Sequence, residues 1–347
     1  MKHKQFNYHI LSSFRTPLMG IAMVSIMCMH YFEDLTIYFD PSTIQYMVGR
    51  SILDVVSTFG VEIFLFLSGI GLYYSWHRHP GFLSFYKKRF TRVLIPYLVI
   101  GSMFFLVYSY DDGINLIKFF KGLFFITFFE RGFHTFWYVL CIMICYLIFP
   151  FIYITLDRAK HPLRALITMI TAVIIVNTTI GIVSNDLFEN IEILLTRFPI
   201  FMIGVYFGRL VMEKKVINKK AMTFYIVTTI IALSLRVVKT SNSLAYWGMY
   251  QRYLAGLLTI PTCLFLCYGL EFAKAKLMHI WNFFGKHSME IFLFHMMYRY
   301  FFRVSDYKTV IPMNEFMMLA LTILSAMLFS YFYNKPKQRR MTYRYSH

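Results

Sequence analysis

The feature that most constrains this chain is the recurrence of apolar segments about 20 residues long. A helix of about 20 apolar residues crosses the roughly 30 Å hydrocarbon core of a bilayer. Over its 347 residues the chain is 58% hydrophobic and only 15% charged, whereas soluble domains carry about 25% charged residues. We therefore expect an all-α, polytopic membrane protein. The alternating segments of about ten residues that are typical of a transmembrane β-barrel do not occur in the sequence.

Ten segments of the required length can be placed along the chain, and one further apolar stretch fits none of them. That stretch, residues 114–129, is interrupted by Lys118, Lys121 and Gly122, so we expect an interfacial or re-entrant helix there. A single transmembrane domain, residues 1–347, is expected, with no separate soluble domain. The ten expected spans are 12–32, 51–76, 90–110, 134–156, 163–183, 190–212, 221–240, 247–272, 282–303 and 313–333.

The connections between these segments alternate in charge. Basic residues gather in both terminal tails and in the even-numbered loops, whereas acidic residues such as Glu33, Asp34 and Asp186 fall in the odd-numbered loops. The positive-inside rule then predicts that both termini are cytoplasmic, which an even number of spans also requires. This arrangement accounts for the formal net charge of +18 without a nucleic-acid partner. We expect a multi-pass protein of the cell membrane, in contact with membrane lipids.

Several segments bring ionisable side chains to a similar depth. His30 lies in the outer half of the first segment, and the second and ninth segments place Glu62 and His295 in the middle or outer half. Ionisable groups inside a membrane are costly and mark functional sites. Some intramembrane ion pairs only hold helices together, and some charged residues snorkel to the interface. A shared depth for three such groups favours a polar cavity instead.

Two arginines stand where the third segment begins. Arg89 and Arg92 are three residues apart on one helical face, and such a pair can bind phosphates through forked hydrogen bonds. The alternative is that they set the topology and contact anionic lipids. The five cysteines all lie in expected spans and are interpreted as packing residues. Their spacing does not match a zinc site, and no metal is expected.

Six stretches together resemble the signatures of the acyltransferase 3 family of membrane O-acyltransferases, over essentially the whole chain. The first span has Gly20-Ile21-Ala22 followed by His30, similar to the family's R-G-I-A…H signature, and GVEIFLFLSGIGL in the second resembles G-V-D-x-F-F-x-x-S-G-F. The other four stretches lie within residues 85–96, 136–150, 197–204 and 285–295. Each motif is weak alone, but six in the right order are specific.

The chain departs from the family pattern at two positions. The arginine that the family carries in the first span falls at Met19, and the nearest arginine is Arg15, one helical turn earlier. The family's aspartate in the second span is Glu62 here, which is a conservative change. Arg15 is therefore a candidate replacement for the family's arginine.

The resemblance implies transfer of an acyl group, expected to be acetyl, from cytoplasmic acyl-CoA to a hydroxyl of a cell-surface polysaccharide or lipid-linked glycan precursor. Acetyl-CoA would be a co-substrate, and no bound cofactor is expected. Arg89 and Arg92, with Arg15, are expected to hold the phosphates of coenzyme A.

The expected chemistry needs a base and donors to the acyl oxygen. His30 is the candidate general base, since histidine titrates near the working pH, and Glu62 is its candidate orienting partner. His295 is either a second nucleophile that relays the acyl group or a structural hydrogen-bonding residue. The candidate donors to the developing oxyanion are Trp137, Arg197 and Ser68.

A multi-pass transporter or exporter of a polar or glycan-type solute is the competing interpretation. Such proteins often contain inverted repeats with broken helices at corresponding positions of the two halves, and no such pairing of Gly and Pro residues is evident in this sequence. A non-catalytic membrane scaffold would not explain ionisable residues at matched depth.

Overall fold

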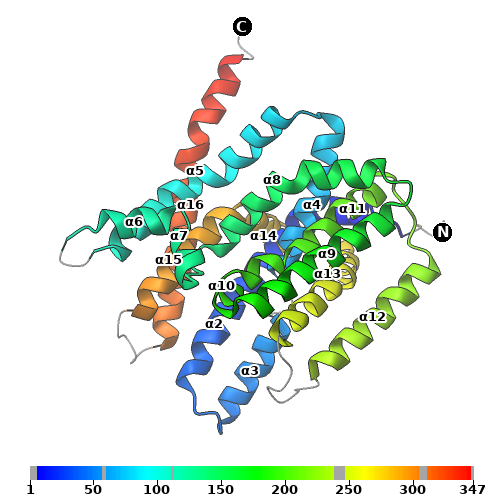
Figure 1. Ribbon diagram of the computed structural model, residues 1–347. Coiled ribbons are helices and arrows are strands. Elements are labelled where there is room, and N and C mark those ends of the chain that lie inside the picture. Colours follow the sequence, from blue (N-terminus) through cyan, green and yellow to red (C-terminus); the bar gives the residue numbers. More distant parts are fainter. Residues whose placement is uncertain (1–5, 57–59, 111–112, 238–246, 305–310, 345–347) are drawn as a thin grey trace.

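The protein is a bundle of helices (Figure 1), seen in a computed structural model that describes residues 6–56, 60–110, 113–237, 247–304 and 311–344. Long helices pack side by side, and α16 projects from the bundle toward the C-terminus. Over these residues the helices are α1 (Ile10–Ser13), α2 (Arg15–Tyr38), α3 (Ile44–Val56), α4 (Val61–Arg78), α5 (Phe82–Tyr108), α6 (Leu116–Leu123), α7 (Ile126–Arg131), α8 (Trp137–Arg158), α9 (Pro162–Val183), α10 (Asn185–Leu195), α11 (Phe198–Met212), α12 (Lys219–Val237), α13 (Trp247–Glu271), α14 (Ala275–Lys286), α15 (Ser288–Val304) and α16 (Ile311–Arg344).

The described helices confirm a multi-pass membrane protein. Seven helical segments are long and apolar enough to cross a bilayer, by length and composition, within the ranges given above. Ten spans were expected, and these seven segments do not confirm that number. The count of ten and the cytoplasmic position of both termini therefore stay predictions. The seven segments are Arg15–Ile37, Phe82–Tyr108, Trp137–Arg158, Pro162–Val183, Asn185–Met212, Gly248–Glu271 and Phe316–Tyr333.

Three of the expected spans are broken rather than continuous. The second, 51–76, is divided between α3 and α4, and its residues 57–59 lie outside the described residues. Gly60 precedes α4 with φ +119°, a conformation that favours glycine. The sixth is broken between α10 and α11, where Pro199 occupies the first turn of α11, a position that suits proline. The ninth is broken at His287, between α14 and α15.

Two further expected helices need comment, one that is divided and one that lies partly outside the described residues. The stretch 114–129 was expected to form one helix, but it forms α6 and α7, separated at Phe125, which adopts a left-handed conformation with φ 61°. Its interfacial or re-entrant position stays a prediction. Helix α12 ends at Val237, and residues 238–240 of the expected seventh span lie outside the described residues.

The first span extends further than the sequence indicated. Helix α2 continues to Tyr38, six residues beyond the expected end at residue 32. The assignment of Glu33 and Asp34 to an outer loop is therefore wrong. Both belong to α2, and Asp34 is buried, with 3% of its surface exposed. Arg299 on α15, described below, pairs with this carboxylate and offsets the free-energy cost of burying its charge.

Two pairs of glycines let helices around the site approach backbone to backbone. A Cβ on Gly20 of α2 would clash with the carbonyl oxygen of Trp281 on α14, and a Cβ on Gly285 would clash with that of Thr16. Helices α4 and α11 meet in the same way, because a Cβ on Gly69 would lie 2.6 Å from the Phe201 oxygen and a Cβ on Gly204 would clash with the Phe66 oxygen. Small residues at such crossings are typical of membrane helices. These contacts fix the helices that carry the candidate site residues.

Candidate functional site

A cavity of about 220 Å³ lies among α2, α4, α5, α8, α14 and α15. On three of these helices its lining residues recur every three or four positions, so each helix contributes a single face. The lining residues from these faces are Arg15, Met19, Met23 and Ile26 of α2; Phe64, Ser68 and Leu72 of α4; and Tyr138, Ile142 and Tyr146 of α8. Helices α2 and α4 run in opposite directions here, since Gly71 packs on Arg15 and Gly60 on Ile26.

One end of the cavity is strongly cationic. Arg15, Arg89, Arg92 and Lys286 all line it, and no carboxylate does so among the described residues. The Nε–H of Arg15 donates a hydrogen bond to the Leu67 oxygen at 3.2 Å. The Nε of Arg89 is buried without a hydrogen-bond partner in the described structure. Like charges gathered this way are unfavourable unless an anion binds among them, so this end suits a phosphate-bearing ligand.

These positions bear on the expected phosphate-binding residues. The structure brings Arg15, Arg89 and Arg92 to one cavity, as a shared role requires. Met19, at the family's arginine position, lines the same cavity one helical turn from Arg15. Arg15 and the family's arginine position therefore border the same cavity, as a replacement role for Arg15 requires. Lys286 was not anticipated from the sequence.

Three aromatic rings form a layer at the opposite end of the cavity. The rings of Phe64 and Tyr138 are 6.1 Å apart between centroids, and those of Tyr138 and Phe292 are 5.4 Å apart. All three side chains are buried and line the cavity. They come from α4, α8 and α15, so this aromatic layer joins three helices. Ser68 lies one turn along α4 from Phe64, on the side of the arginines.

Two histidines pair just beyond the aromatic layer. His30 follows Ile26 by one turn of α2, and His295 follows Phe292 by about one turn of α15. The Nδ1 of His30 and the Nε2 of His295 are 3.0 Å apart in a buried hydrogen bond, with the rings stacked at 5.2 Å. Which nitrogen donates depends on the tautomers. The structure thus brings together two of the three expected catalytic residues.

An ion pair that the sequence interpretation missed lies one turn further along both helices. Arg299 of α15 donates hydrogen bonds from Nε and Nη2 to the two carboxylate oxygens of Asp34, each at 2.8 Å. It also donates to Glu33 at 2.9 Å. The signal was present in the spacing, because Asp34 follows His30 by four residues and Arg299 follows His295 by four. Parallel helices bring such pairs into register.

Glu62, Arg197 and Trp137 form a second polar group, which we call the outer cluster. The Glu62 carboxylate lies 3.2 Å from the Nε of Arg197, and the Arg197 guanidinium lies 5.6 Å from the Trp137 ring centroid. Glu62 is in the first turn of α4, where the helix dipole favours a negative charge. The ion pair of Glu62 is with Arg197, whereas the hydrogen bond described for His30 is with His295. The expected action of Glu62 on His30 stays a prediction.

The fold and the site together define a class of protein. It is a multi-pass membrane protein in which a buried pair of histidines lies beside a cavity with a cationic end. The family model described as an acyltransferase domain matches residues 18–335, nearly the whole chain. The chain therefore belongs to the acyltransferase 3 family. Membership supports a membrane acyltransferase and gives no support to the transporter alternative. No curated protein and no solved structure matches the chain.

Proposed function

We propose that this protein transfers an acyl group, acetyl in the simplest case, from cytoplasmic acyl-CoA to a hydroxyl of a cell-surface polysaccharide or lipid-linked glycan precursor in the cell membrane. One observation carries the proposal. Arg15, Arg89 and Arg92 line one cavity whose far end lies one helical turn from His30. A cationic entrance and a basic residue at the other end suit a donor with phosphates at one end and a thioester at the other.

The phosphates of coenzyme A would bind at the cationic end. Arginine forms forked hydrogen bonds with phosphate oxygens, and Lys286 adds a further positive charge. Residues 15 and 30 are about 22 Å apart along α2, at 1.5 Å per residue. The flexible arm of the donor would follow the cavity over this distance, and the rings of the aromatic layer would move aside to admit the thioester.

The acyl transfer itself needs a proton acceptor. When His30 donates its Nδ1–H to His295, its Nε2 keeps a lone pair and can act as a general base. The acceptor hydroxyl loses its proton to Nε2 while its oxygen forms a bond to the thioester carbonyl carbon. The carbon–sulfur bond then breaks, and His30 returns the proton to the departing thiolate. The products are the ester and free coenzyme A.

The remaining site residues take supporting roles in this proposal. His295 orients the His30 ring through their hydrogen bond, so a covalent relay through His295 is not required. Glu62 holds Arg197 in the outer cluster. There, Arg197 and Trp137 can donate hydrogen bonds to the developing oxyanion or to the hydroxyl-rich acceptor. Ser68, on the arginine side of the aromatic layer, is a donor to the incoming thioester.

Replacing His30 with alanine is the direct test. General base catalysis contributes about 10²–10⁴-fold, so His30→Ala is expected to lower acyl transfer by a factor in that range. Transfer of radiolabelled acetyl from acetyl-CoA to the envelope glycan fraction of membrane vesicles measures it. His161→Ala, in the exposed link between α8 and α9, is the control. Unchanged transfer by a folded His30→Ala protein would contradict the role of His30.

Replacing Arg89 tests the donor site separately. Arg89→Ala is expected to raise the apparent KM for acetyl-CoA about tenfold or more, because a charge-assisted hydrogen bond is worth about 1.5–3 kcal/mol. Lys88→Ala is the matched control, since Lys88 is the neighbouring cation but does not line the cavity. Equal KM values for the two variants would contradict a role of Arg89 in binding acetyl-CoA.

A further inference from the structure

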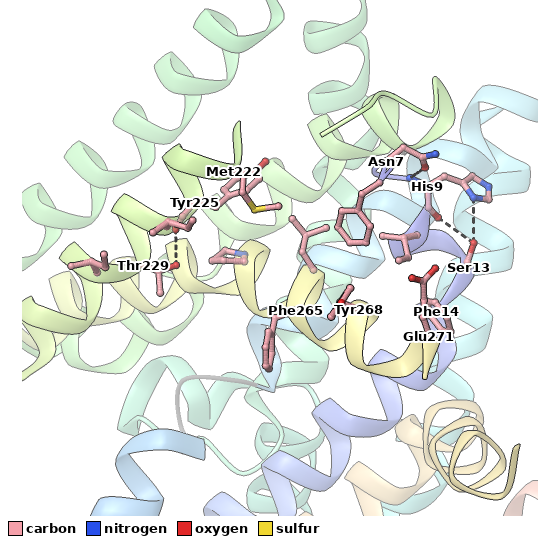
Figure 2. Close-up of a pocket in the computed structure, with 16 residues that line it drawn as sticks. Asn7, His9, Ser13, Phe14, Met222, Tyr225, Thr229, Phe265, Tyr268 and Glu271 are labelled. Carbon is pink, nitrogen blue, oxygen red and sulfur yellow. Dashed lines mark hydrogen bonds between the residues drawn. The ribbon is translucent and has the colours of Figure 1, made fainter. Parts of the chain in front are cut away.

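A second and larger cavity lies away from the histidines, along the side of the bundle. It has a volume of about 910 Å³ and lies between α12, α13 and the segment that leads into α2 (Figure 2). We call it the side groove. Ser13 and Phe14 line the side groove, whereas the adjacent Arg15 lines the cationic cavity of about 220 Å³ described above, which we call the arginine cavity. The two cavities are therefore distinct, and both border the junction between α1 and α2.

The long walls of the side groove are apolar and face outward. Met222, Ile226 and Ile230 line it along one face of α12, and Phe265 lines it from α13. Ile226 is 53% exposed and Phe265 is 75% exposed. The groove is therefore open at the surface of the helix bundle. Helix α13 is one of the seven candidate membrane spans, and α12 forms most of the expected seventh span. On membrane helices such exposed apolar side chains face hydrocarbon. Fatty acyl chains match these walls in polarity.

One end of the side groove is polar, as Figure 2 shows. Asn7, His9, Ser13 and Glu271 gather there, and the Ser13 hydroxyl hydrogen-bonds with His9 Nδ1 at 3.2 Å. Lys219 begins α12 three residues before Met222, so the two share a side of the helix. Exposed lysines lie in the chain segments next to this end, around the start of α12 and just after the end of α13, and they outnumber the acids of these segments, Glu213 and Glu271. They are Lys214, Lys215, Lys219, Lys220, Lys274 and Lys276.

The length of the side groove matches half of a bilayer. From Met222 to Ile230 the α12 wall rises about 12 Å, and from Pro261 to Glu271 the α13 wall rises about 15 Å. One leaflet of the hydrocarbon core is about 15 Å deep. A molecule whose chains fill one leaflet and whose headgroup lies at its surface fits this geometry.

We infer that the side groove binds one anionic phospholipid, with its acyl chains along α12 and α13 and its phosphate among the lysines. Basic pockets beside membrane helices bind anionic headgroups in this way. The inference is independent of the acyl-transfer proposal, because it concerns a different cavity. It also does not require the lysines to take part in the reaction.

Filling the groove is the first test. Ile226→Trp places a large ring within the groove, whereas Ile231→Trp, on the opposite face of α12, is the matched control, with a parent side chain 52% exposed. Native mass spectrometry of detergent-solubilised protein with added dioleoylphosphatidylglycerol measures the retained lipid. Retention of one lipid by the parent and by Ile231→Trp, and about tenfold less by Ile226→Trp, is the expected result. Equal retention by both variants would overturn the inference.

Headgroup preference is the second test. The parent is expected to retain phosphatidylglycerol over dioleoylphosphatidylcholine, and Lys219→Gln/Lys220→Gln is expected to reduce this preference about tenfold. Lys160→Gln, at an exposed site between α8 and α9, is the control. Equal retention of the two lipids by the parent would show non-selective lipid contact and overturn the inference. Thr229→Phe, also within the groove, replaces Ile226→Trp if that variant does not fold.

Discussion

At the residue scale, the His30–His295 hydrogen bond and the Asp34–Arg299 ion pair link α2 to α15 at two positions, one helical turn apart. The ion pair is buried, so its charges are far less screened than those at a surface. It holds the two helices in the register that brings the imidazole rings together. We therefore regard Arg299 as a positioning residue for the histidine pair.

Removal of Arg299 tests this role. Arg299→Gln removes the positive charge from beside the buried Asp34 carboxylate, which is expected to cost about 3–5 kcal/mol of stability. Arg209→Gln is the control, because Arg209 pairs with Glu213 at an exposed site worth about 1 kcal/mol or less. Unfolding in denaturant, followed in detergent, measures both. The double variant Asp34→Asn/Arg299→Gln is expected to recover part of the loss. Equal effects of Arg299→Gln and Arg209→Gln would contradict this view.

The sequence predicted individual site residues unevenly. Arg89 and Arg92 were readable because basic residues at a span boundary stand out, and His30 and His295 because an imidazole in an apolar segment is costly. Asp34 was not readable, since a carboxylate near the end of a span is ordinarily a loop residue. Its pairing with Arg299, 265 positions away, stabilises the buried carboxylate.

At the element scale, two residues of the outer cluster lie next to breaks between helices. Glu62 follows the break before α4, and Arg197 directly precedes α11. Average hydropathy over 20 residues does not detect such breaks, which is why spans 51–76 and 190–212 were expected to be continuous. Gly60 and Pro199 marked them locally, but both residues also occur within unbroken membrane helices. The recurrence of apolar helices, and so a multi-pass membrane protein, was easier to predict than the continuity of each span.

The contact between α4 and α11 depends on Gly204. A Cβ there would overlap the backbone of Phe66, so Gly204→Ala is expected to force the helices apart at a cost of about 1–3 kcal/mol. Acyl transfer should fall as well, because these helices carry Glu62 and Arg197. Gly256→Ala in α13 is the control, since its Cβ would have no neighbour nearer than 3.9 Å. Thermal unfolding of both variants measures the difference, and a stable Gly204→Ala protein would contradict it.

At the scale of the whole molecule, the pairing of α2 with α15 fixes their relative direction. His30 pairs with His295 and Asp34 with Arg299, so the two helices run the same way. This agrees with the expectation that the first and ninth spans both run outward. Helices α2 and α4 run in opposite directions, as consecutive spans must. The absolute orientation in the membrane is predicted from the positive-inside rule.

Cysteine labelling tests the orientation. Lys214→Cys is expected to be cytoplasmic and Asp186→Cys outside, by the positive-inside rule. Both parent side chains are exposed, whereas the five native cysteines are buried or half-buried. A membrane-impermeant maleimide added to intact cells should label Asp186→Cys and spare Lys214→Cys until the membrane is opened. The reverse pattern would invert the topology and place the arginine cavity on the outer side.

The aromatic layer has a consequence for the ion permeability of the membrane. A protein with a cationic cavity on one side and a polar cluster on the other risks becoming a leak for ions. The contacting rings of Phe64, Tyr138 and Phe292 close the cavity at one end and offer little stabilisation to a passing ion, whose desolvation is expensive. This layer of rings would therefore present an apolar barrier to ions in the resting protein.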